Sequence, residues 1–96
     1  MSVDQPAPPP KIYEPTDPDD LRDVFAYWVR LHRSAKGWSQ ERLAMECDFD
    51  RTYVSGVERR TWNVSLSRIE DFAKALDVPA WSLLRPPEAA LAKKSR

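Results

Sequence analysis

The sequence predicts an all-α fold built from five short helices. Three observations support this: apolar residues recur at helical spacing in separate segments, residues that favour helix N-caps precede those segments, and no segment shows the apolar–polar alternation of a strand. The chain has 96 residues, which is enough for one small domain. A core of that size is marginal, which favours support from a partner subunit.

The predicted organisation is an N-terminal arm at 1–16, a helical domain at 17–87 and a C-terminal tail at 88–96. The arm contains five of the nine prolines and few apolar side chains, so we expect it to be extended and disordered. Residues 1–20 hold one lysine and five acidic residues, whereas residues 21–96 hold fourteen basic and ten acidic residues. An acidic segment therefore precedes a basic domain, although the net charge of the whole chain is zero.

The first helix is expected to begin at Asp17, with Pro18 in the first helical position and further aspartates near the positive end of the helix dipole. Lys36-Gly37 should end it, because a cation and then a glycine favour a helix C-terminus. Its buried stripe is predicted to contain Leu21, Val24, Phe25, Trp28 and Leu31, with His32 beside it in a structural role.

Two shorter helices are predicted at 40–46 and 51–58. Ser39 and Asp50 are good N-caps for them. Asp48-Phe49 forms the turn between them, because aspartate tolerates the left-handed backbone that such a turn requires. The apolar positions fall on one face of each helix: Leu43, Ala44 and Cys47 on the first, Val54 and Val57 on the second.

A loop at 59–64 leads to a fourth helix, which Ser65 caps. Its buried stripe is predicted to contain Leu66, Ile69, Phe72, Ala73 and Leu76. Asp77-Val78-Pro79 breaks this helix, and Pro79 opens a fifth short one that contains Trp81, Leu83 and Leu84 and stops at Arg85-Pro86-Pro87. Residues 88–96 either add a weak helical turn or fray.

The composition excludes several classes of function. One cysteine, Cys47, and one histidine provide neither an internal disulfide nor a set of zinc ligands, and a reducing cytoplasm is the expected setting. The two glycines, Gly37 and Gly56, do not form a phosphate-binding loop, and no nucleophile–base pair has the required context, so we expect no enzyme and no cofactor. No apolar run approaches the ~20 residues that span a bilayer, and no secretory signal is recognisable, so no membrane association is expected.

The helix at 51–58 presents a surface suited to a DNA groove. Arg51, Thr52, Ser55, Gly56 and Arg59 share its exposed face, where they supply small, polar or guanidinium groups. The mild positive charge of residues 21–96 is sufficient for contact with phosphates. Residues 39–58 therefore predict a helix–turn–helix that reads double-stranded DNA.

Three segments carry a resemblance to a known family: Trp38-Ser39-Gln40-Glu41-Arg42-Leu43-Ala44, Asp50-Arg51-Thr52-Tyr53-Val54-Ser55-Gly56-Val57-Glu58-Arg59 and Ala73-Lys74-Ala75-Leu76-Asp77-Val78. In these segments the chain resembles the phage repressor and Cro-like, or xenobiotic-response-element, helix-turn-helix family. The middle segment is most similar to the small controller proteins of restriction–modification operons. The resemblance implies a five-helix repressor-like domain that regulates transcription in a bacterial, phage or plasmid setting.

The resemblance also implies roles for individual residues. Arg51 and Thr52 match base-reading positions, and Ser55 and Gly56 lie one turn later on the same side. Arg33 and Glu58 match an ion pair that joins the first helix to the third. Contacts with DNA phosphates are expected from Ser39, Gln40, Tyr53, Arg59, Arg60 and Asn63. Two alternatives stay open: Arg51 as a phosphate clamp or solvated charge, and Tyr53 as a residue that packs beside the second helix.

The chain departs from the family pattern at three positions. Asp48 stands where the reader turn usually has glycine, Arg60 where glycine usually follows the third helix, and Val64 where proline often precedes the cap of the fourth. Each is a local backbone preference, so the fold prediction stands, and Arg60 either strains its loop or adds a phosphate contact. Of the tryptophans, Trp28 and Trp38 are predicted to lie in the core and Trp62 to be exposed.

A homodimer is expected, because this family commonly builds a two-fold contact at the last helix. That contact would include Val78, Trp81 and Leu84. Two subunits would read half-sites about one helical turn apart. A second interpretation is a protein-interaction module of the antitoxin or coactivator type. The acidic, proline-rich arm keeps it open, because the arm is a passive tail, a segment that binds a protein partner or one that competes with DNA.

Overall fold

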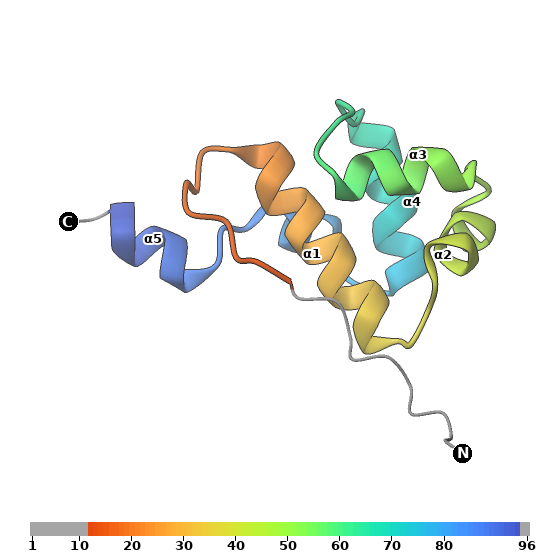
Figure 1. Ribbon diagram of the computed structural model, residues 1–96, viewed down its shortest axis with the longest axis horizontal. Coiled ribbons are helices and arrows are strands. Elements are labelled where there is room, and N and C mark those ends of the chain that lie inside the picture. The colour runs from red at the N-terminus through yellow and green to blue at the C-terminus, as the bar shows by residue number, and fades with distance from the viewer. Residues whose placement is uncertain (1–11, 95–96) are drawn as a thin grey trace, which may run out of the picture.

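Residues 12–94, the part of the chain that this computed structural model describes, form five α-helices and one 3-10 helix and contain no strand (Figure 1). These are α1 (Leu21–Ala35), α2 (Gln40–Cys47), α3 (Arg51–Glu58), α4 (Leu66–Leu76), the 3-10 helix η1 (Ala80–Leu84) and α5 (Glu88–Lys94). The all-α prediction is confirmed. The second, third and fourth predicted helices also have nearly the bounds expected of them.

Helix α1 begins at Leu21 rather than at Asp17. The side chain of Asp17 instead accepts a hydrogen bond from the N–H of Asp19 at 2.9 Å, and its carbonyl accepts one from the N–H of Asp20 at 3.1 Å. Asp20 is the N-cap and accepts from the N–H of Asp23 at 3.3 Å. Short acidic side chains compete with helical hydrogen bonds in this way, so the last aspartate of the stretch caps the helix and the first does not.

The two ends of the chain add detail to the predicted organisation. Residues 1–11 of the predicted arm lie outside the described residues, whereas residues 12–16 follow an irregular path in which Pro15 is buried. The fifth predicted helix is η1, which is 3-10 rather than α: the N–H of Ser82 bonds to the carbonyl of Pro79 at 3.0 Å, and Pro86 follows too soon for an α-helical ladder. Residues 88–94 form α5, at the end of the molecule opposite α2 and α3 in Figure 1.

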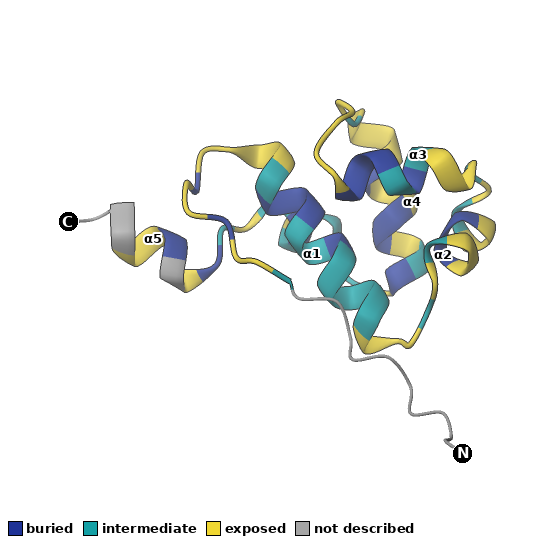
Figure 2. Ribbon diagram, viewed as in Figure 1, coloured by how far each residue is buried: buried dark blue, intermediate teal, exposed yellow. Residues whose placement is uncertain are grey.

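The core lies between α1, α2, α3, α4 and η1, and the buried segments of α1 to α4 are dark blue in Figure 2. Phe72 is fully buried, and its ring meets Phe25 edge-on with centroids 5.4 Å apart. Trp28 is half-buried and donates from Nε1 to the carbonyl of Arg85 at 2.7 Å, which ties α1 to the end of η1. The buried cluster contains Phe25, Val29, Leu43, Ala44, Val54, Val57, Ile69, Phe72, Ala73, Leu76 and Leu83.

Two residues of the predicted buried stripes are exposed instead. Leu21 is 53% exposed and Leu66 is 77% exposed. Each is the first residue of its helix and lies beside a surface hollow instead of the core. Helical periodicity shows which face of a helix is apolar but not how far along the helix the packing partner extends.

Helices α1 to α4 end with the same backbone motif. Just beyond each, one residue has positive φ: Gly37 (72°), Asp48 (58°), Arg60 (64°) and Asp77 (60°). The following residue donates its N–H to a carbonyl five residues back, as Thr61 does to Gly56 at 2.8 Å. The prediction of a left-handed backbone at Asp48 is confirmed. Three of the four positions carry a side chain, and a Cβ makes the left-handed backbone conformation less favourable, so each of these three helix ends lowers the stability of the fold slightly.

The substitution Arg60→Gly is expected to raise the free energy of unfolding by ~0.5–1 kcal/mol, because glycine adopts positive φ without the clash that a Cβ meets. The partly exposed ion pair of Arg60 with Asp23, at 3.7 Å, offsets little of this gain. Chemical denaturation checks it. Gly37→Ala is the reverse control, since a Cβ there would meet nothing within 4 Å and only the backbone cost remains. A less stable Arg60→Gly protein would show that the ion pair outweighs the backbone effect.

Candidate nucleic-acid interface

One face of helix α3 packs against the rest of the domain, and the opposite face is exposed to solvent. Val54 and Val57 are buried in the core, and Glu58 is only 4% exposed. Arg51 and Thr52, which are predicted to read bases, are exposed in the first turn. The surface needed for groove recognition is therefore presented by a helix whose position the core fixes.

The first turn of α3 has a defined hydrogen-bonding state. None of the acidic side chains that the structure describes forms an ion pair with Arg51. Asp50 caps the helix: its Oδ1 accepts from the N–H of Thr52 at 3.0 Å and from Thr52 Oγ1 at 2.8 Å. These two bonds hold the pKa of Asp50 below its ordinary value, so the cap is ionised at neutral pH. The hydroxyl proton of Thr52 is used in the cap, which leaves its methyl group for apolar contact.

Ser55 and Gly56, one turn later, have different surroundings. Ser55 Oγ accepts a hydrogen bond from the guanidinium of Arg59, so Arg59 lies back along α3. Gly56 is buried beneath the indole of Trp62, and a Cβ at this position would overlap Trp62 Nε1 and Cδ1. Gly56 therefore makes room for Trp62, a role that differs from the base-reading one predicted for it.

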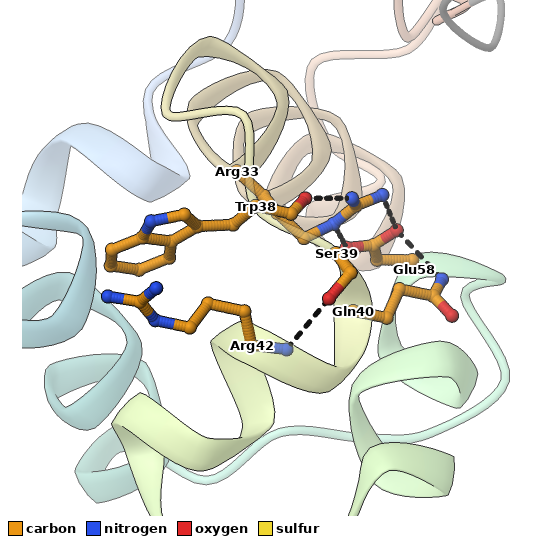
Figure 3. A network of polar contacts seen from close by, with 6 residues as sticks. All are labelled: Arg33, Trp38, Ser39, Gln40, Arg42 and Glu58. Atoms are coloured by element: carbon orange, nitrogen blue, oxygen red, sulfur yellow. Dashed lines mark hydrogen bonds and ion pairs between the residues drawn. The ribbon is translucent and has the colours of Figure 1, made fainter. Parts of the chain in front are cut away.

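An ion-pair network ties α3 to the two preceding helices (Figure 3). Arg33 of α1 meets both carboxylate oxygens of Glu58, with Nε–Oε2 at 2.6 Å and Nη2–Oε1 at 2.9 Å. Arg33 Nη1 also donates to the carbonyl of Trp38 at 2.7 Å, just before α2, and Gln40 Nε2 donates to Glu58 Oε1 at 3.1 Å. Arg33 is 12% exposed and Glu58 4%, so a largely desolvated network sets the orientation of α3.

Two cationic side chains lie near the start of α2, where Ser39 and Gln40 are expected to contact phosphate, and one of them, Arg42, also pairs with Glu46 at 2.9 Å. Ser39 caps the helix, and its Oγ accepts from the N–H of Arg42 at 3.0 Å. The Arg42 guanidinium and the Lys36 ammonium lie 4.9 and 5.0 Å from the centroid of the Trp38 ring, as Figure 3 shows for Arg42. Trp38 is half-buried against the core, and its remaining surface positions these cations.

A polar hollow of about 470 Å³ lies between α1 and the end of α3. Its lining residues are Arg30, Arg33, Gln40, Glu58, Arg59 and Arg60. Arg60 pairs with Asp23 of α1 at 3.7 Å, and Asn63 is exposed in the following loop. Arg30 is an addition to the predicted basic residues. Arg30 lies on a half-buried part of α1, and nothing in the sequence apart from its charge indicates a role for it.

The side chain of Tyr53 packs against its neighbours and does not project into solvent. Its hydroxyl is buried and has no hydrogen-bond partner in the described part of the chain, and its ring meets Phe49 with centroids 5.2 Å apart. The guanidinium of Arg68 covers the Tyr53 ring at 4.5 Å from its centroid. Arg68 is exposed in the first turn of α4, where a cation opposes the helix dipole. That unfavourable placement is a signal in the sequence that singles out Arg68 as a candidate for the interface.

The three residues predicted for a dimer contact do not share one hollow. Leu84 lines an apolar hollow of about 180 Å³, together with Leu21, Trp62 and Leu66. Val78 lines a separate, more polar hollow beside the end of α4. Trp81 is 65% exposed on η1.

Cys47 is half-buried, with Sγ 3.9 Å from the carbonyl oxygen of Asp71. Burial, and then the negative charges of Asp71 and Glu46, raises the pKa of the thiol to about 11.

Within residues 12–94, no three histidine, cysteine, aspartate or glutamate side chains gather in a way that could hold a metal ion. Over the same range, the helices are too short or too polar to cross a membrane.

Comparison with known sequences finds related proteins. The model of a family described as a helix-turn-helix domain matches residues 26–81. The chain is 59% identical over 75 residues to a hypothetical transcription factor of Neisseria meningitidis serogroup B, a match that spans 78% of this chain and 71% of that protein. It is 49% identical over 67 residues to the control protein C.BamHI of Bacillus amyloliquefaciens, spanning 69% of this chain and 83% of that protein.

Solved structures share the fold. The crystal structure of the hypothetical transcription factor NHTF from Neisseria matches with a TM-score of 0.74 at 54% identity, over 85% of this chain and 98% of that one. The restriction–modification controller protein C.Esp1396I, 28% identical, was solved as a tetramer in complex with its natural 35 base-pair operator, with a TM-score of 0.64 over 81% of this chain and 99% of that one. Variants of C.Esp1396I in which an arginine, a threonine or a tyrosine is replaced, at three consecutive positions, were also solved.

Proposed function

This chain belongs to the helix-turn-helix domain family, and we propose that it is a transcription regulator that recognises a specific sequence of double-stranded DNA by placing α3 in the major groove. The observation that carries the proposal is that α3 is fixed in position on one face and exposed on the other. A buried ion pair and apolar contacts hold one face, and the other exposes Arg51 with no acidic partner among the described residues. Relatives named as a transcription factor and a control protein, and one solved on its operator, support the same activity here.

Base recognition is assigned to the exposed face of α3. Arg51 carries a long planar donor that reaches O6 and N7 of one guanine together, and Thr52 offers its methyl group to the methyl of a thymine. Ser55 supplies a hydroxyl once Arg59 turns to a phosphate. The order Arg-Thr-Tyr at 51–53 supports this assignment, because the same three residue types were replaced at consecutive positions of C.Esp1396I.

Phosphate contacts are assigned to both sides of α3. Ser39 and Gln40 lie at the positive end of α2, and Arg59, Arg60 and Asn63 lie at the far end of α3. Arg68 joins this group because its exposed guanidinium lies over Tyr53 at the start of α4. The hydroxyl of Tyr53 is left out, since it is buried.

We assign the DNA-bound state to two copies of the chain. A two-fold dimer reads half-sites about one helical turn apart, and C.Esp1396I is a tetramer on its operator. No catalytic activity or cofactor is part of the proposal, because the named relatives are regulators. The protein would act in the cytoplasm of a bacterial cell, where its operator lies.

Selection of bound duplexes from a random DNA pool, followed by titration of the selected duplex and a scrambled one, tests this function. The selected duplex should bind at least ~10³ times more tightly than the scrambled one. For both, the logarithm of the affinity should fall linearly with the logarithm of the salt concentration, with a slope of ~0.9 per phosphate contacted. A protein that binds neither duplex at low salt, or both equally, would contradict the proposal and favour a protein-interaction module.

A further inference from the structure

The loop that joins α3 to α4, residues 59–64, takes its course mainly from side chains. Its first part is fixed by the end of α3, where the N–H of Thr61 bonds to the carbonyl of Gly56 at 2.8 Å. Among the described residues, no backbone–backbone hydrogen bond joins residues 62–64 to the rest of the chain, and the next one belongs to α4. The packing of side chains therefore decides where residues 62–64 lie.

Trp62 packs directly on α3. The Nε1 and Cδ1 atoms of its indole lie against Gly56, and the three atoms nearest to a Cβ at that position would all belong to this ring. Such a Cβ would overlap Nε1 and Cδ1, so the indole occupies the place of a side chain at position 56. Trp62 also lines the apolar hollow and is 49% exposed, while Val64 adds a partly buried contact with the core.

We propose that Trp62 is a positioning residue for DNA binding. Seated on Gly56, its indole holds the loop against α3, so that Arg60 and Asn63 meet the sugar–phosphate backbone beside the groove. This inference rests on the proposed function, in which α3 lies in that groove. Arg60 precedes Trp62 by two residues and Asn63 follows it directly, and both are exposed. In this role the indole acts through its neighbours and not by touching DNA.

The energetic cost of this arrangement favours a role beyond joining two helices. Gly56 is less favourable than alanine inside a helix, Arg60 has a Cβ at a φ of 64°, and Trp62 leaves half of a large apolar side chain in water. Unfavourable features that gather at one place are typical of functional sites. The ion pair of Arg60 with Asp23 does not replace the indole, because at 3.7 Å, with side chains 51% and 27% exposed, it contributes little.

The position of Gly56 on α3 explains why a contact there matters for recognition. Gly56 lies one helical turn beyond Thr52, so the indole is next to the face that is proposed to read bases. The loop is therefore placed relative to α3 and not only relative to α4. A loop already in place loses less conformational entropy when it meets a phosphate, and a tryptophan side chain, which has only two torsions, is itself ordered at low entropic cost.

Titration of one half of the selected duplex, which a single copy of the chain can occupy, tests this role without a contribution from the association of two copies. Trp62→Ala should weaken binding to this duplex and to a scrambled one of equal length by a similar factor, about fivefold to tenfold, because the loop must then be ordered at the moment of binding. The salt slope should fall by roughly 0.9, the share of one phosphate, since Arg60 is no longer held there.

A control and a conservative variant accompany this titration. Met45 is 73% exposed on α2 and lines neither of the two hollows beside the loop, so Met45→Ala should change binding by less than about twofold. Trp62→Phe keeps a flat apolar ring that can lie on Gly56, so it should bind both duplexes within about threefold of the unmodified chain and restore the salt slope. Circular dichroism checks that each variant is folded.

A cycle of Gly56→Ala, Trp62→Ala and the double variant tests the contact between the indole and α3. In the unmodified chain, Gly56→Ala should displace the indole, lower Tm and weaken binding to both duplexes about as much as Trp62→Ala does. In the Trp62→Ala background the same substitution should leave binding unchanged and raise Tm, because no ring then occupies the space and alanine is the better helix former. Such a reversal of sign requires direct contact between the two positions.

The results separate this inference from the proposed function. If Trp62→Ala binds both duplexes as the unmodified chain does, or loses affinity only for the selected one, Trp62 does not position the loop, even though DNA is bound. If Trp62→Phe is as weak as Trp62→Ala, the indole contacts DNA itself and the positioning role is wrong. If the unmodified chain binds neither duplex, the proposed function fails and the role in DNA binding fails with it, while the reversal in Tm still reports the contact with Gly56.

Discussion

A Glu58→Ala protein is expected to have a free energy of unfolding about 3–5 kcal/mol lower than the unmodified protein. The substitution leaves Arg33, which is 12% exposed, without its carboxylate and removes the acceptor of Gln40. A buried charge without a partner costs more than the pair itself contributes. In a domain of this size each kcal/mol changes Tm by roughly 4–8 °C, so a thermal scan detects the loss.

Two further variants make the Glu58 result interpretable. Glu46→Ala breaks the ion pair with Arg42, in which the side chains are 52% and 40% exposed, and should cost no more than about 0.5 kcal/mol. Glu58→Gln keeps the shape of the side chain and should fall between the two. All scans use one protein concentration, because the proposed dimerisation would contribute to stability. Equal melting of Glu58→Ala and Glu46→Ala would show that Arg33 turns to solvent when its partner is removed.

The substitution Arg51→Ala is expected to cost ~1–3 kcal/mol of binding free energy on the selected duplex and to relax the preference at one base pair in each half-site. Arg51 opens α3 directly after the Asp50 cap, is exposed, and has no acidic partner to give up among the described residues. Its guanidinium is therefore available for two parallel hydrogen bonds to a guanine. Titration of the selected duplex and of single-base variants measures both effects.

Arginines at the edges of α3 provide the comparison. Arg59→Ala and Arg68→Ala should weaken the selected and the scrambled duplex by similar factors and reduce the salt slope by about one unit for each phosphate that the protein no longer neutralises. Arg59 must also release Ser55 to reach a phosphate, so its effect should be the smaller of the two. If Arg51→Ala also weakened both duplexes equally, Arg51 would be a phosphate clamp and α3 would be rotated from the position proposed.

The features predictable from the sequence are those set by local chemistry. Ser39, Asp50 and Ser65 cap the helices expected of them, because an oxygen at that position satisfies free N–H groups within the next turn. Asp48 adopts positive φ for a similarly local reason. The pairing of Arg33 with Glu58 depended on the family resemblance, since residues on different helices have no spacing rule that joins them.

The features that could not be predicted depend on how the helices pack together. The burial of the Tyr53 hydroxyl requires Phe49 and the cover provided by Arg68 of α4. The placement of Trp62 on Gly56 requires the loop to fold back over α3, and its only trace in the sequence is a glycine in a helix where alanine would be more stable. A glycine in a helix interior is evidence of a close neighbour, although it does not identify that neighbour.

The half-buried Cys47 makes the protein convenient for chemical labelling. Thiol-directed reagents attack the thiolate, and a thiol with a pKa of about 11 is almost fully protonated at neutral pH. A second cysteine placed at an exposed position such as Met45 would react far faster than Cys47. Paired spectroscopic probes can therefore be attached to two copies, and the distance between them measured with and without DNA, without first replacing the native cysteine.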